Sequence, residues 1–216
     1  MLTSMKFKKA VFVIFCFFYN FVSLAAHPHM FLNSKLEFFW EGSELKKCRV
    51  TWDFDKFFSS DIISAYDYDR DGVFNEEENW AVYYNAFINL KNYYYFFFIR
   101  DGKERFTPEE VSDFKASYKD GTLRYSFTVD IPEIKGETVA IAVYDYTFFC
   151  DIAYDEENPV VFYYDGAKVK PEYKIAKNKN YPVYYNPLGA IDDTTVYYEW
   201  KKGLETFYPS EILVKY

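Results

Sequence analysis

One stretch of twelve residues, 67–78, carries oxygen-bearing side chains at the spacing of an EF-hand calcium loop. Calcium is a hard cation that takes about six to eight oxygen ligands. The pattern D-x-[DN]-x-[DN]-G-x5-E is matched at every required position, and Gly72 occupies the point where such a loop turns sharply. The predicted calcium ligands are the side chains of Asp67, Asp69, Asp71, Asn75 and Glu78 and the backbone carbonyl of Val73.

Apolar residues recur at helical spacing on both sides of this stretch, which predicts a helix, a loop and a second helix that ends near residue 91. They are Phe58, Ile62, Ile63 and Tyr66 before the loop and Trp80, Tyr83, Tyr84 and Phe87 after it. The alternative is a solvated acidic turn between two helices, which the matched positions disfavour. Sensor EF-hands normally occur in pairs. Because no second such loop follows, we expect a structural rather than a regulatory calcium site.

The only two histidines of the chain, His27 and His29, form a second candidate site on either side of Pro28. Imidazole nitrogens suit copper, nickel or zinc. If the chain is cut after Ala26, the α-amine of His27 joins the two imidazoles. Pro28 has no N–H, which excludes the type of terminal copper or nickel site that uses the second amide nitrogen. The alternative is that both histidines are ordinary polar residues that lead into a strand.

The residues before these histidines predict an export signal. Lys6, Lys8 and Lys9 precede an apolar run over residues 10–22, and small residues suited to cleavage follow. The run is too short to span a bilayer as a stable helix. We therefore expect a signal peptide over residues 1–26 and a periplasmic or secreted protein, with an uncut N-terminal anchor as the alternative.

Composition and charge restrict the class of partner. Half of the residues are apolar and 24% are aromatic, so the chain can bury a sizeable core. A net charge of −8 disfavours nucleic acid and anionic membranes and is compatible with cations. Cys48 and Cys150 remain after the predicted cleavage. In an oxidising compartment they form either one disulfide or two separate buried thiols. The sequence leaves both alternatives open, because it does not give the distance between their Cα atoms.

Short alternating segments separated by Asp-Gly turns predict a mainly β (α+β) fold, an antiparallel β-sandwich with the helix-loop-helix EF-hand inserted at about residues 56–91. Hairpins are predicted at residues 101–102, 120–121 and 165–166. The sandwich domain covers residues 27–173, and residues 174–216 form a C-terminal extension, separate from this domain or part of it. The predicted strands are 30–40, 46–54, 93–100, 114–119, 122–129, 138–146, 147–154, 160–164, 167–173 and 195–200, with a linker or loop at 174–180.

Several fragments, in this order and spacing, resemble a bacterial exported family of unknown function, commonly described as the periplasmic component of an uncharacterised ABC-type transport system. The fragments are AHPHMF at 26–31, TWDFD at 51–55, the loop at 67–78, DGK at 101–103 and VYDYTFF at 143–149. The likeness covers about residues 26–162, and Tyr146 stands where family members often have proline. The resemblance implies a metal-associated protein whose mature chain begins His-Pro-His, with relatives near nickel, cobalt or zinc transport genes.

Three classes of function are consistent with these features. We expect a non-enzymatic, exported cation-binding protein that holds Ca2+ in the single EF-hand and is accessory to transition-metal transport or homeostasis, with Cu2+, Ni2+ or Zn2+ at the histidines and a membrane metal transporter as a partner. The second class is a copper-dependent oxidative enzyme that uses the N-terminal histidines, since no other catalytic motif is present. The third is an aromatic-lined module that binds sugars or peptides, although core packing explains the same aromatic content.

Overall fold

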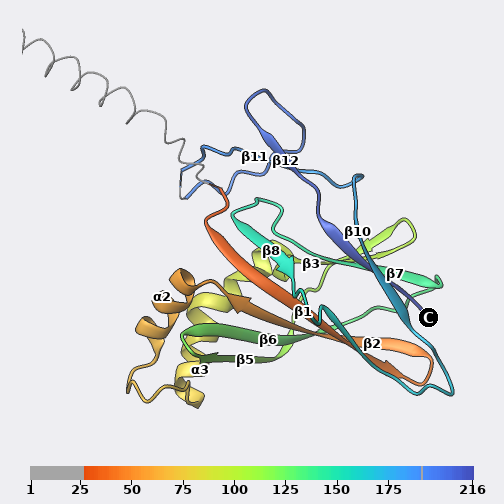
Figure 1. Cartoon of the computed structure of the whole chain (residues 1–216), viewed down its shortest axis with the longest axis horizontal. Helices are drawn as coiled ribbons and strands as arrows, with labels where there is room; N and C mark the ends of the chain where they lie inside the picture. Colours follow the sequence, from red (N-terminus) through yellow and green to blue (C-terminus); the bar gives the residue numbers. More distant parts are fainter. Residues whose placement is uncertain (1–26, 191) are drawn as a thin grey trace, which may run out of the picture.

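The computed structural model describes residues 27–190 and 192–216 (Figure 1). The predicted signal peptide and its cleavage site lie outside the described residues. Strands contain 43% of the described residues and helices 17%, so the mainly β prediction is confirmed. In the described part of the chain, none of the helices combines the length and the apolar character needed to cross a membrane.

The larger sheet has six strands, in the order β5-β6-β2-β1, with β8 and β9 both paired to the free edge of β1. Its strands are β1 (Met30–Glu41), β2 (Glu44–Phe54), β5 (Ser112–Lys119), β6 (Thr122–Asp130), β8 (Cys150–Tyr154) and β9 (Val160–Tyr163). The first four strands pair antiparallel, whereas β8 and β9 run parallel to β1, which corrects the expectation of a purely antiparallel arrangement. Parallel pairing needs a long connection, and the chain supplies it by passing through the second sheet.

The second sheet has five antiparallel strands in the order β10-β13-β7-β3-β4. They are β10 (Glu172–Lys177), β13 (Ser210–Lys215), β7 (Thr138–Val143), β3 (Phe97–Asp101) and β4 (Glu104–Phe106). The last strand, β13, thus lies between β7 and β10 (Figure 1). A separate two-stranded sheet pairs β11 (Val183–Tyr185) with β12 (Glu205–Phe207).

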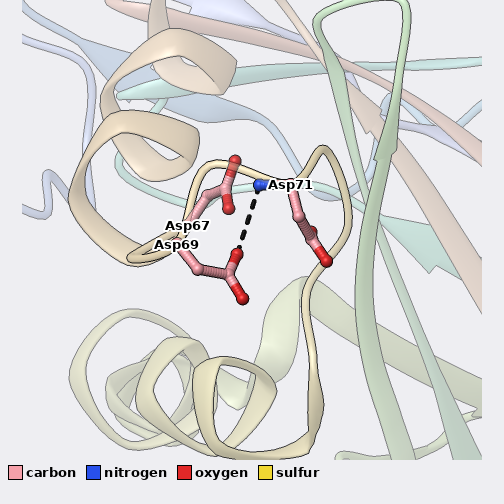
Figure 2. A group of neighbouring side chains, drawn as sticks. All are labelled: Asp67, Asp69 and Asp71. Carbon is pink, nitrogen blue, oxygen red and sulfur yellow. Dashed lines mark hydrogen bonds between the residues drawn. The ribbon is translucent and has the colours of Figure 1, made fainter.

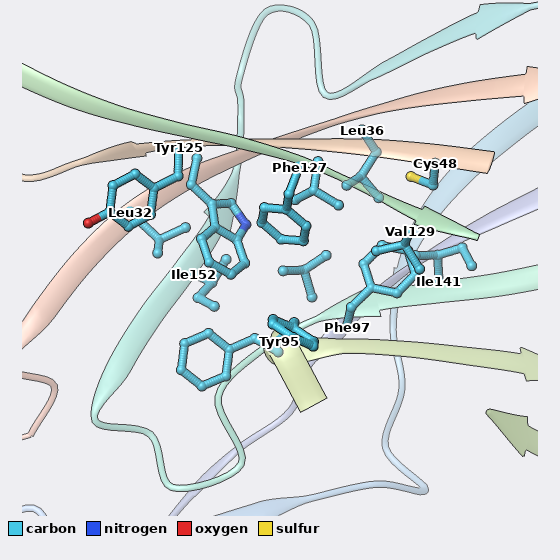
Figure 3. Close-up of a cluster of buried hydrophobic side chains, with 14 of the residues drawn as sticks. Leu32, Leu36, Cys48, Tyr95, Phe97, Tyr125, Phe127, Val129, Ile141 and Ile152 are labelled. Atoms are coloured by element: carbon cyan, nitrogen blue, oxygen red, sulfur yellow. The ribbon is translucent and has the colours of Figure 1, made fainter. Parts of the chain in front are cut away.

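The two large sheets share one hydrophobic core (Figure 3). Alternate residues of β1 and β2 are buried, so each strand presents an apolar face to this core. Trp52 of β2 packs edge-to-face on Phe127 of β6 at 4.8 Å between ring centroids. Phe97 of β3 and Ile141 of β7 belong to the same cluster from the opposite sheet. Each such fully buried side chain stabilises the fold by about 1.5–3 kcal/mol.

The segment between β2 and β3 is helical. It contains α2 (Lys56–Tyr66), α3 (Glu76–Val82), a π-helical turn (Tyr83–Phe87) and a 3-10 segment (Ile88–Phe96). Asp55 caps α2, because its Oδ1 accepts hydrogen bonds from the amides of Phe57 and Phe58 at 2.8 and 3.0 Å. The second helix, α3, is regular only as far as Val82, whereas the sequence predicted a helix that continues to about residue 91.

Tyr94, Tyr95 and Phe96 correct the prediction of a strand over residues 93–100. Their φ angles are 55°, 50° and 55°, a left-handed conformation that cannot continue a pleated strand. Strand β3 therefore begins only at Phe97. The ring of Tyr95 is nevertheless buried and packs on Phe87 at 5.7 Å between ring centroids. The predicted strand is therefore correct only from Phe97 on, while Tyr95 and Phe96 are buried in a turn and Tyr94 is 45% exposed.

The hairpins at Asp101-Gly102 and Asp120-Gly121 are confirmed, with Gly102 and Gly121 at φ angles of 57° and 68°. The hairpin predicted at Asp165-Gly166 is wrong, because β9 pairs with β1 while β10 pairs with β13 in the other sheet.

Two further predictions for the C-terminal part are also corrected. Most of the predicted linker at 174–180 lies in β10, whose six residues are all exposed and therefore show no alternation of burial. The strand predicted at 195–200 is reduced to one isolated bridge between Tyr184 and Tyr197.

Candidate metal centres

The loop between α2 and α3 brings three of the predicted calcium ligands together (Figure 2). One carboxylate oxygen from each of Asp67, Asp69 and Asp71 lies within 4.8 Å of the other two. Asp67 is the residue at which α2 ends, so the helix fixes the first of the three side chains. Three negative charges at this separation repel one another unless a cation lies between them. The arrangement suits a divalent ion with oxygen ligands.

Short side-chain to backbone contacts shape this loop. Asp69 Oδ1 accepts a hydrogen bond from the Asp71 amide at 3.2 Å, drawn as the dashed line in Figure 2, and Asp71 Oδ1 accepts one from the Val73 amide at 2.9 Å. Such contacts are typical of aspartate in turns. Gly72 has a φ of 94°, a conformation that side chains disfavour, which explains the glycine at this point of the pattern.

Asp67 is the most buried of the three carboxylates, with 9% of the residue exposed. Its Oδ2 accepts a hydrogen bond from the hydroxyl of Tyr118 at 2.5 Å. Its Oδ1 is buried and has no hydrogen-bond partner among the described residues. A buried charged oxygen without a partner costs free energy, and a bound cation would remove that cost.

Glu78 does not join the three aspartates. It is 1% exposed, and its Oε1 and Oε2 accept hydrogen bonds from the amides of Tyr68 and Asn75 at 2.6 and 2.9 Å. Asn75 Oδ1 in turn accepts a hydrogen bond from the Glu78 amide at 3.0 Å, which completes a capping box at the start of α3. In this structure Asn75 and Glu78 therefore hold the two ends of the loop together, and their side chains do not join the group of three aspartates.

The β5–β6 hairpin supports the loop from the side of the sheet. The Phe74 ring packs edge-to-face on Tyr118 of β5 at 5.0 Å between ring centroids. Asn79 of α3 donates to the Ala116 carbonyl at 2.7 Å and accepts from the Ala116 amide at 3.2 Å. Sequence reasoning missed Tyr118 and Asn79, because their contacts span 51 and 37 residues and no local pattern reports them.

Tyr118 is a hydrogen-bond donor over a wide pH range. Burial raises its pKa to about 12, together with the hydrogen bond to Asp67 and the negative charges of Asp67, Asp71 and Glu78. At neutral pH the hydroxyl is therefore protonated and points its hydrogen at Asp67. This bond ties β5 to the carboxylate at the end of α2.

The two histidines form a separate pair just before β1, and neither belongs to the acidic group. Their ring centroids are 4.6 Å apart with the planes at 65°, and His29 lies 5.1 Å from the ring of Phe149. Burial and the charge of His27 lower the pKa of His29, against the opposing effect of a hydrogen bond to the Ala190 carbonyl. The His29 ring is therefore neutral at pH 7, which is the form that binds metals.

The structure places Cys48 and Cys150 as two separate buried thiols, and the disulfide alternative is wrong. Cys48 lies opposite Phe38 of β1, and Cys150 lies opposite Met30 of the same strand. Eight residues of strand separate these partners, about 26 Å at ~3.3 Å per residue. A disulfide needs Cα atoms within about 7 Å. Burial raises the pKa of both thiols, which makes them poor nucleophiles and metal ligands.

Two comparisons with known proteins bear on this chain. A family model described as "Protein of unknown function (DUF1007)" matches residues 12–216. The chain is also 31% identical over 110 residues to an uncharacterised 15.5 kDa protein from the trpE 3' region of Spirochaeta aurantia. That alignment covers 50% of this chain and 79% of the relative.

Proposed function

We propose that this chain, which belongs to the DUF1007 family of proteins of unknown function, is an exported protein that binds calcium in the loop between α2 and α3. The observation that carries the proposal is the buried Asp67 Oδ1, which has no partner in the described chain and belongs to a group of three carboxylates. An ion with a preference for oxygen ligands would satisfy this atom and remove the repulsion between the three side chains.

The first ligands of this site are Asp67, Asp69 and Asp71, with the Val73 carbonyl as a further oxygen. Glu78 can contribute its two oxygens only by giving up its hydrogen bonds to Tyr68 and Asn75. That exchange costs free energy. We therefore expect a weak site, with a Kd of ~10⁻⁴ to 10⁻³ M, as in extracellular calcium modules.

Calcium has a structural role in this proposal. The ion would join the end of α2 to the loop, and the bond from Tyr118 to Asp67 would connect it to β5. The capping box meanwhile holds the start of α3. The β5–β6 hairpin also contacts the loop through the rings of Tyr118 and Phe74. Binding therefore stabilises the helical insertion on the sheet rather than opening a surface for a partner.

The resemblance to an exported, transport-associated family supports a wider proposal. In it the protein is accessory to transition-metal transport or homeostasis and has a membrane metal transporter as its partner. Calcium would keep the helical insertion folded outside the cell, where calcium is abundant. The transition metal would then bind elsewhere, since carboxylate ligands favour hard cations.

Thermal unfolding tests the calcium proposal. At 10 mM calcium a site of the expected affinity stabilises the folded state by about 1–3 kcal/mol, because calcium binds only that state. The exported protein should therefore melt at a higher temperature with calcium than with a chelator. Asp71→Ala, which removes a ligand oxygen, should remove this difference, whereas Asp61→Ala, at an exposed carboxylate on α2, should retain it. The same melting temperature for the wild-type protein with calcium and with chelator would contradict the proposal.

A further inference from the structure

Each of the two histidines has one ring nitrogen without a partner. Nδ1 of His27 and Nε2 of His29 are buried and make no hydrogen bond within the described part of the chain. His27 is only 6% exposed, so bulk solvent has little access to its side chain. Buried polar atoms normally have a partner, and an unpartnered one calls for an explanation such as an ion. Two such nitrogens on neighbouring rings suit a metal that prefers imidazole ligands.

The C-terminal segment determines the hydrogen-bonding state of the His29 ring. The backbone carbonyl of Ala190 faces this ring and raises the pKa of His29. Because Nε2 is buried and has no partner, Nδ1 is the nitrogen on the side of this carbonyl. A neutral imidazole that carries its proton on Nδ1 has its lone pair on Nε2. The unpartnered nitrogen of His29 is therefore the one that can bind a metal.

Asp193 approaches the His27 ring from the same segment. A Cβ atom at Gly189 would lie 2.7 Å from His27 Nε2 and 2.7 Å from Asp193 Oδ2, so the ring and the carboxylate both border this glycine. Asp193 Oδ1 is held by the Thr195 amide at 3.0 Å, which leaves Oδ2 directed at this space. A carboxylate near Nε2 favours the tautomer with the proton there and the lone pair on Nδ1.

We propose that His27 Nδ1 and His29 Nε2 bind one divalent late first-row transition metal, and that Ala190 and Asp193 position the two rings from the side of their other nitrogens. Metal-bound histidines commonly direct the second ring nitrogen at a carboxylate or a backbone carbonyl, and a group of each kind borders the rings here. Ligand chemistry alone places Cu2+ above Ni2+ and Zn2+ in affinity. This inference specifies the metal site of the wider transport proposal, but it does not depend on the calcium loop.

Calorimetric titration of the exported protein with Cu2+, Ni2+ and Zn2+ tests the ligands, with calcium present throughout. We expect one site per chain and the tightest binding for Cu2+. His27→Ala and His29→Ala should each abolish this site, and Asp71→Asn should leave it intact because that residue belongs to the calcium loop. Undiminished copper binding in the His27→Ala/His29→Ala double variant would overturn the inference while leaving the calcium proposal untouched.

Asp193→Asn tests the positioning role. Loss of such a partner weakens metal affinity by about 10- to 100-fold, and the nitrogen couplings in the Cu2+ electron paramagnetic resonance spectrum should change as the His27 ring shifts. The melting temperature of the metal-free protein should stay close to that of the wild type. Asp192→Asn, at the neighbouring exposed carboxylate, is the matched control and should change neither quantity. An unchanged affinity and spectrum in Asp193→Asn would exclude the proposed role.

Gly189→Ala tests whether the space between the His27 ring and Asp193 matters for metal binding, without removal of a polar group. The added methyl would overlap His27 Nε2 and Asp193 Oδ2, so copper affinity should fall. Gly166→Ala is the control, since a Cβ there meets only Tyr164 at 3.9 Å. Equal copper affinity in the two glycine variants would show that residues 189 and 193 do not constrain the His27 ring.

Discussion

The hydroxyl of Tyr118 donates a hydrogen bond of 2.5 Å to Oδ2 of Asp67, a residue 51 positions earlier in the chain. Tyr118 belongs to β5 and Asp67 stands where α2 ends, so this contact joins the larger sheet to the first residue of the acidic loop. It also uses one oxygen of Asp67 and leaves the other buried and without a partner in the described chain. The sheet therefore fixes the orientation of the carboxylate that we propose as the first calcium ligand.

Replacement of Tyr118 by phenylalanine should destabilise the calcium-free protein by about 1–3 kcal/mol, because it leaves a buried carboxylate oxygen without its donor. The ring contact with Phe74 is retained in this variant. Urea unfolding in the presence of chelator measures the difference. Tyr68→Phe, an exposed loop tyrosine, is the control and should have wild-type stability. Equal unfolding midpoints for Tyr118→Phe and wild type would contradict the importance of this bond.

The same hydroxyl predicts a pH dependence in the alkaline range. Its pKa is raised to about 12 in the folded state, mainly by burial, and is about 10 in an unfolded chain. The protonated form is thus favoured by folding, so its contribution is complete below pH ~10 and is lost as the pH rises through about 12. Between these values wild-type stability should fall more steeply than that of Tyr118→Phe. Parallel curves would show that the hydroxyl does not contribute.

Substitution of Ile212 tests how much the C-terminal strand β13 contributes to the stability of the fold. It is fully buried in β13, and its register partner on β10, Ile175, is 41% exposed. Ile212→Ala should cost about 2–5 kcal/mol through lost burial and the cavity left behind. Ile175→Ala should cost much less, since its side chain reaches solvent. Chemical denaturation compares the two variants, and similar losses would argue against a core position for β13.

The two cysteines predict a simple chemical result. Both thiols are buried, and their partner residues lie far apart along β1. A thiol reagent should therefore label neither cysteine in the native protein. After denaturation without reductant the exported protein should release two reactive thiols per chain. Detection of none would mean that Cys48 and Cys150 form a disulfide and that the pairing of β8 with β1 is wrong.

The strands that could be predicted from the sequence are those with one buried and one exposed face. Residues 30–40 and 46–54 alternate in this way, and β1 and β2 agree with the prediction to within two residues at each end. The left-handed turn at Tyr94 could not be predicted, because a run of aromatic residues has the same composition in a buried strand and in a buried turn. Strand β10 was missed since it has no buried residues to form a pattern.

For the loop at residues 67–78, too, the sequence predicts what depends on local spacing and misses the contacts that only the tertiary fold creates. The spacing of Asp67, Asp69 and Asp71 is local, so it predicts a group of carboxylates that the fold does bring together. The role of Glu78 as a cap was not predicted, although the Asn75–Glu78 spacing is that of a capping box. Tyr118 and Asp193 reach their sites only through the tertiary fold, and no single-sequence pattern could have identified them.

Equilibrium dialysis against labelled calcium tests the central claim most directly, because it counts bound ions without reference to stability. The exported wild-type protein should bind one calcium ion per chain at millimolar calcium. The Asp67→Asn/Asp71→Asn double variant should bind none, and the Asp61→Asn/Asp165→Asn control, which changes two exposed carboxylates outside the loop, should bind one. No bound calcium in the wild type, or equal binding in the two double variants, would contradict a calcium site in the loop between α2 and α3.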